Sequence, residues 1–136
     1  MEIKPTSANV IDLLKLAGVN SLAVAGEAGI ARSVAIPLPA GAPSFSLEYQ
    51  VSSEGSVAVK IELEQGNEPP DTEGEEDSNF VVPDGAAGID NNLDDELVHI
   101  KSYAPSATAF ARIKASGLTS NDDSTEITRL RLIFIK

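Results

Sequence analysis

The chain has 136 residues, which is enough for one domain with a single hydrophobic core. Its 21 acidic and 10 basic residues give a formal net charge of -11, which disfavours direct contact with DNA or with an anionic membrane surface. It contains no cysteine, which excludes disulfides, thiolate metal ligands and cysteine nucleophiles.

The N-terminal segment, residues 1–20, is predicted to dock onto the rest of the chain. Apolar residues recur at helical spacing over residues 9–18, and Gly18 is well placed to end a helix. A strand is the alternative, because Ile11 and Leu16 interrupt the apolar stripe. Charged residues interrupt the apolar run of this segment, so we expect neither a secretion signal nor a membrane span.

Two later segments alternate apolar and polar residues with the period of a strand. They are residues 45–52 and 57–64, and Ser53, Glu54 and Gly55 lie between them. This pattern predicts a β-hairpin with one face buried. Two prolines in the preceding segment, residues 33–39, remove backbone donors and place it at a sheet edge or strand end.

Residues 66–79, the acidic loop, contain two prolines, two glycines and no aliphatic residue, which is typical of a long solvated loop. Three further strand candidates follow, at residues 97–103, 108–115 and 125–135. Such a succession of strands predicts a mainly β chain. We therefore expect one domain over residues 1–136, an antiparallel β-sandwich or jelly roll with one short N-terminal helix or strand.

No set of residues fits a catalytic cycle. His99 is the one histidine, and no serine elbow, metalloprotease motif or phosphate-binding glycine loop accompanies it. A glycosidase needs two carboxyls across a cleft that usually has aromatic rings for the sugar, whereas this chain has no tryptophan and only 4% aromatic residues. We expect no enzymatic activity.

A calcium site is one interpretation of a second acidic segment, residues 90–96. Asp90, Asn92, Asp94 and Glu96 place oxygen ligands at alternate positions, which can surround a hard cation. The glycine that usually follows the third ligand is missing, and Lys101 occupies the twelfth position. The alternative is a set of turn residues that satisfy their own backbone, with no cofactor at all.

Four basic residues lie on the late strand candidates. Arg112 and Lys114 share one strand face, and Arg129 and Arg131 share another. They either form the solvent face of a sheet or pair with the acidic loop of a neighbouring copy, which would make them subunit-contact residues.

The C-terminal part of the chain resembles two kinds of β protein. The residues concerned are Asp95–Ile100, Tyr103–Pro105, Ala111–Gly117 and Asn121 with Thr125. Over about residues 80–134 they resemble small β-sandwich virion proteins of tailed phages, such as capsid decoration proteins. The same run is similar to the last strands of discoidin-like, sugar-binding jelly rolls.

The first resemblance implies a non-enzymatic structural protein of a bacteriophage virion. Such a protein would be made in the host cytoplasm and would cement the capsid surface. Its partners would be further copies of itself, as a homo-oligomer with a trimer favoured, and the major capsid protein, but neither nucleic acid nor a membrane. The alternative function is a carbohydrate-binding module that uses calcium.

Overall fold

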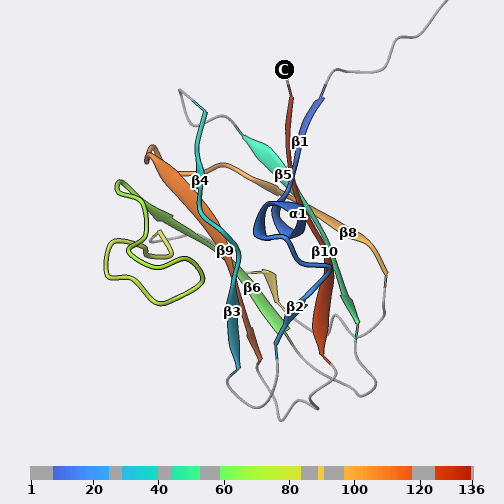
Figure 1. Ribbon diagram of the computed structural model, residues 1–136. Coiled ribbons are helices and arrows are strands. Elements are labelled where there is room, and N and C mark those ends of the chain that lie inside the picture. The colour runs from blue at the N-terminus through green and yellow to red at the C-terminus, as the bar shows by residue number, and fades with distance from the viewer. Residues whose placement is uncertain are drawn as a thin grey trace, which may run out of the picture.

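The computed structural model is a β-sandwich of two antiparallel sheets that face each other (Figure 1). It describes residues 8–24, 29–39, 44–52, 59–83, 89–90, 97–117 and 125–135. The predicted fold class is therefore confirmed: strands dominate, and the described part contains one short helix.

We call the sheet that contains the N-terminal strand sheet A. Its strand order is β1 (Ala8–Asp12), β10 (Glu126–Ile135), β5 (Phe45–Ser52) and β8 (His99–Tyr103), with β2 (Leu22–Ala23) also paired to β10. Every pairing in it is antiparallel. Within the described residues, β1 and β8 are thus the strands at the two ends of this order, and the long strand β10 joins the N-terminal segment to the rest of the sheet.

Sheet B forms the second layer. Its strands are β3 (Ile30–Arg32) and β4 (Ile36–Pro37), both paired to β9 (Phe110–Gly117), then β6 (Val59–Gly66) and β7 (Ile89–Asp90). The proline-rich segment lies at the edge of this sheet as expected, because β4 pairs with β9 alone.

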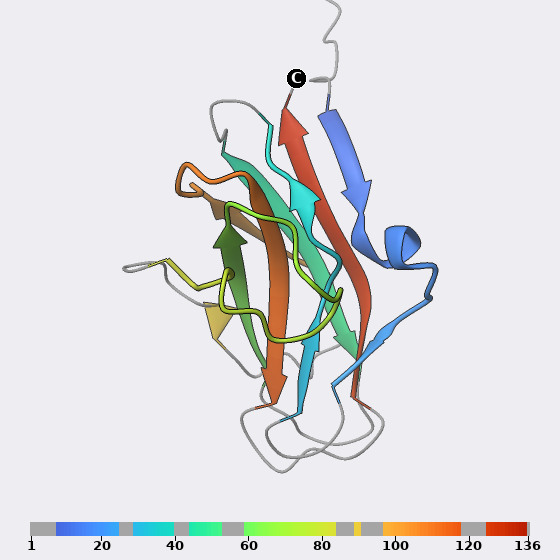
Figure 2. The same ribbon diagram turned by 60° about the vertical axis from the view of Figure 1, so that its left-hand side comes forward.

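The predicted β-hairpin is wrong, although both of its strands exist. β5 pairs with β10 and β8 in sheet A, whereas β6 pairs with β9 and β7 in sheet B. The alternation reports that one face of each strand is buried, and this holds equally when the two faces meet across a sandwich. The chain therefore crosses from one layer to the other between these strands (Figure 2).

The N-terminal segment combines the two predicted alternatives. It forms β1 and then the helix α1 (Leu13–Ala17). The carboxylate of Asp12 accepts hydrogen bonds from the backbone of Leu14 and Lys15 at the helix start, and Gly18 ends the helix with φ 71°. Leu13 and Leu14 are buried in the core, so the segment docks onto the sandwich as predicted.

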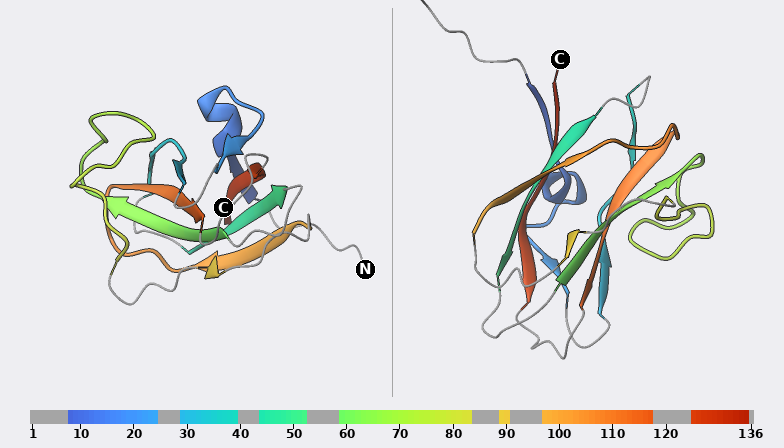
Figure 3. Two further views of the ribbon diagram at one scale, coloured as in Figure 1. Left: turned by 90° about the horizontal axis from the view of Figure 1, so that it is seen from below. Right: turned by 180° about the vertical axis from the view of Figure 1, so that it is seen from behind.

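The core lies between the two sheets and is built mainly from aliphatic side chains. β5 contributes alternate residues from Phe45 to Val51, and β6 and β9 contribute the facing layer. At one end of the core, the ring of Phe45 packs against Tyr103 and Phe134, with centroid distances of 5.5 Å and 5.2 Å. Figure 3 shows the two layers end-on and from behind.

The acidic loop and the residues after it lie against the outer face of sheet B. Val81 and Gln65 exchange two backbone hydrogen bonds, and Phe80 is buried. At the base of the loop, a Cβ on Gly66 would collide with the carbonyl oxygen of Asn79. The loop side chains are mostly exposed, in agreement with the prediction, although the loop also covers part of the sheet.

Candidate functional site

The outer face of sheet A carries a ladder of alternating charges. Arg131 on β10 donates to Asp12 on β1 at 3.4 Å and to Glu48 on β5 at 3.2 Å. Arg129, one step along the same face, donates to the same oxygen of Glu48 at 3.1 Å. These two arginines do share a strand face as predicted, and here each is paired with a carboxylate of its own chain.

The ladder is only partly covered. The side chains of Arg129 and Arg131 are 36% and 38% exposed, and ion pairs at such exposure contribute at most about 1 kcal/mol each. Burial alone would raise the pKa of Asp12. Hydrogen bonds from Lys15, Arg131 and Leu14 lower it by more than burial raises it, so the pKa of Asp12 lies below its ordinary value. The ladder therefore orients side chains on this face more than it stabilises the fold.

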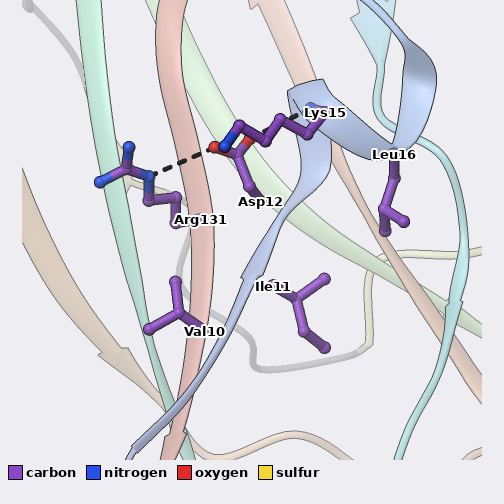
Figure 4. A pocket seen from close by; sticks show the side chains of 6 residues that line it. All are labelled: Val10, Ile11, Asp12, Lys15, Leu16 and Arg131. Carbon is purple, nitrogen blue, oxygen red and sulfur yellow. Dashed lines mark hydrogen bonds and ion pairs between the residues drawn. The ribbon is translucent and has the colours of Figure 1, made fainter.

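A hollow of about 590 Å³ lies at the β1 end of sheet A. It is lined by Val10, Ile11, Asp12, Lys15, Leu16 and Arg131. In Figure 4, Ile11 and Leu16 lie on one side of β1, and Val10 and Arg131 lie on the other. The hollow thus runs along the end strand of the sheet, with aliphatic walls and charged groups at one end.

Exposed aliphatic side chains also gather at the opposite end of sheet A. Leu97, Val98 and Ile100 are 61%, 44% and 64% exposed, respectively. His99 lies on the opposite face of β8 from Ile100: its ring is half-buried and stacks on the ring of Tyr49, with the centroids 5.4 Å apart. β8 therefore turns its aliphatic residues outward and its histidine and tyrosine inward.

Arg112 departs from the expectation of a solvent-facing or subunit-contact residue, because it is fully buried. Its Nε donates to Glu64 at 2.9 Å, and Arg32 donates to the same oxygen at 3.1 Å. The ring of Phe80 covers the guanidinium at 4.4 Å. Lys114, two residues along β9, stays half-buried on the outer face of sheet B.

The acidic loop is what buries Arg112. The Glu73 carboxylate accepts a hydrogen bond from the backbone of Ala35 at 3.0 Å, which ties the loop to the edge of sheet B. Asp77 accepts from the backbone of Asp71 and Asn79; these bonds, with the attraction of the nearby Arg112, lower its pKa. The loop carboxylates therefore hold the loop together and offset buried positive charge within one chain.

The candidate calcium ligands fall largely outside the described residues. Asp90 lies in β7, where only its backbone is described, and Asn92, Asp94 and Glu96 lie outside the described part. Among the residues that the structure does describe, no group of three or more acidic, histidine or cysteine side chains could hold a metal ion.

Two observations bear on membranes and sugars. No helix in the described ranges has the length and apolarity needed to span a bilayer. All six aromatic residues are described, and none is exposed: four are buried to 4% exposure, and Tyr103 and Phe110 are half-buried.

No model of a protein family matches the sequence, and neither does any curated protein with which it was compared.

Proposed function

We propose that this chain is a non-enzymatic structural protein whose work is assembly, and specifically a decoration protein of a tailed-phage capsid. The observation that carries the proposal is the position of the exposed aliphatic residues. Val10 and Leu16, 53% and 58% exposed, lie at one end of sheet A, and Val98 and Ile100 lie at the other. Exposed aliphatic residues gathered at sheet edges are typical of surfaces that bind other proteins.

The free energies favour contacts that are weak singly and act together in many copies. Full burial of one aliphatic side chain contributes about 1.5–3 kcal/mol, whereas association costs roughly 4–15 kcal/mol in lost freedom. Two copies with a net charge of -11 each also repel one another. Contacts of this size are weak between isolated molecules and become effective when a lattice holds many copies side by side.

The capsid assignment rests on the resemblance of residues 80–134 to virion decoration proteins. The partners we propose are a second copy of the chain, with a trimer favoured, and the major capsid protein. The mechanism is mechanical: aliphatic edges become buried and charges pair between neighbours, which strengthens the shell against internal pressure. The location that we propose is the virion surface.

The carbohydrate-binding alternative ranks second. Sugar rings usually stack on exposed aromatic side chains, and here Tyr49 and the other rings are buried or half-buried. Binding to a glycan array that disappears with a chelator would promote this alternative over assembly.

The proposal is tested by co-sedimentation with expanded tailed-phage capsids that lack their own decoration protein. Wild-type protein should pellet with the capsids in a saturable, stoichiometric amount. The double variant Val10→Lys/Ile100→Lys should lose most of this binding. Val81→Lys is the matched control, because Val81 is 59% exposed but lies beside β6 of sheet B. Failure of the wild-type protein to pellet, or equal loss in the control, would overturn the proposal.

A further inference from the structure

The hollow at the β1 end of sheet A is shaped to receive an extended strand. One edge of β1 pairs with β10. No strand within the described residues pairs with the other edge of β1. Ile11, on the core-facing side of β1, and the α1 residue Leu16 both line the hollow beside this edge (Figure 4). A strand edge beside a helix, with aliphatic walls between them, is an arrangement that proteins use to add a strand from another molecule. We call it the β1 groove.

The β8 edge has the complementary form. β5 pairs with β8 on one side, and β8 ends the strand order of sheet A within the described part of the chain. The exposed side chains of Val98 and Ile100 stand beside the half-buried Lys101. Edges of this kind are templates for pairing with a further strand.

We propose that the β8 edge of one copy pairs with the β1 groove of the next copy, so that sheet A continues from molecule to molecule. The inference deepens the proposed assembly function and rests on it. The register that keeps the buried face of sheet A on one side places Ile100 of one copy opposite Val10 of the next, because both side chains lie on the outer face. Along the order β1, β10, β5, β8 the strands alternate in direction, and the next copy in the same orientation therefore presents β1 antiparallel to β8.

Charge favours this head-to-tail pairing over pairing of identical edges. Two β8 edges facing each other would bring two copies of Lys101 to one junction, and like charges in facing positions are destabilising. In the head-to-tail arrangement, Lys101 instead lies opposite the uncharged Asn9, and no second lysine faces it. The exposed side chains of Ile100 and Val10 then cover each other on the outer face of the junction.

The arrangement uses two different surfaces on each copy, which has a geometric consequence. A heterologous contact forms a ring if the rotation between copies closes, and an open row if it does not. A trimeric ring is therefore compatible with it, whereas a two-fold dimer is not.

The test uses two variants, each blocked at one surface. Lysines are the natural means of blocking a strand edge. Val10→Lys/Leu16→Lys blocks the β1 groove and leaves the β8 edge intact; Val98→Lys/Ile100→Lys does the reverse. All four side chains are at least 44% exposed, so both variants should fold, which urea unfolding checks. Each variant alone should have the mass of a monomer, 14.2 kDa, by light scattering, and their mixture should form a 1:1 dimer that grows no further.

A second measurement detects the same contact when it is weak. The chain has no cysteine, so introduced cysteines have no competing background. A mixture of the Val10→Cys and Ile100→Cys variants should form a heterodimeric disulfide much faster than either variant alone. The same mixture with Val81→Cys in place of Ile100→Cys is the control.

Each outcome decides between the two proposals. Dimers of the groove-blocked variant alone would show β8-to-β8 pairing and overturn the inference. Monomers throughout, with cysteine cross-linking no faster than in the control, would also overturn it, and would leave capsid co-sedimentation as an independent result. A 1:1 dimer from a protein that does not bind capsids would support the inference and refute capsid decoration.

Discussion

Replacing Glu64 with glutamine removes the carboxylate that Arg32 and Arg112 share beneath Phe80. The side chains of the three charged residues are 7%, 9% and 0% exposed, so the two guanidinium groups would be left buried without their common counter-charge. Breaking a buried ion pair by removing one partner costs about 3–5 kcal/mol. That is a large part of the roughly 5–15 kcal/mol by which a domain is stable.

The assay is urea unfolding followed by far-ultraviolet circular dichroism, because the chain has no tryptophan to serve as a fluorescent probe. With a urea dependence of roughly 2 kcal/mol per M, the unfolding midpoint should fall by about 2 M. Glu62→Gln is the matched control on the same strand. Its pair with Lys60 is longer, at 3.5 Å, and more exposed, so its loss should stay below about 1 kcal/mol.

A further variant separates lost charge from lost packing. Replacing all three residues together, as Arg32→Leu/Glu64→Leu/Arg112→Met, removes every buried charge of the cluster. Its stability should return to near the wild-type value or exceed it, as hydrophobic replacement of a buried charge cluster often does. If Glu64→Gln costs no more than Glu62→Gln, or if the triple variant is the least stable of the set, the shared carboxylate does not offset the two buried arginines as described.

Three further predictions follow from single features. Gly66→Ala should lower stability by about 1–3 kcal/mol, seen as a lower urea midpoint, because the new Cβ meets the backbone of Asn79. Asp12→Asn should lower the midpoint at pH 7 but not at pH 2: a lowered pKa gives stability that is present above the ordinary value of 3.8 and lost as the pH falls through the folded value. A constant difference between the two pH values would contradict this. Tyr103→Phe should be neutral or stabilising, by up to about 1 kcal/mol, because its buried hydroxyl, whose pKa burial raises, has no hydrogen-bond partner among the described residues; a clear loss of stability would show that a partner exists.

Local patterns were sufficient to predict the main strands and the end of the helix, but not its start at Asp12. The alternation over residues 45–52 gives the buried face of β5, and Gly18 ends α1 as its position in the sequence predicts. Local patterns did not predict which strands pair. β5 lies beside β10, about eighty residues away, rather than beside β6. The alternation of a strand carries no information about which neighbour it has.

The same limit applies to the candidate site. Arg129 and Arg131 were predicted to share a strand face because residues two apart on a strand do so. Nothing in the sequence around Arg112 distinguishes it from them, since the loop that buries it belongs to a distant part of the chain. Its burial follows from the closing of that loop, and only tertiary structure reveals it.

The place of β10 in sheet A also has a consequence for synthesis on the ribosome. All strands of sheet B are complete at Gly117, whereas β1 and β5 are joined only by β10, which ends at Ile135. At roughly 5–20 residues per second, the remaining stretch takes on the order of one to four seconds to be translated. Until β10 is available, β1 and β5 have no strand between them and sheet A cannot cover the core, so aggregation during expression should be most sensitive to changes in β10.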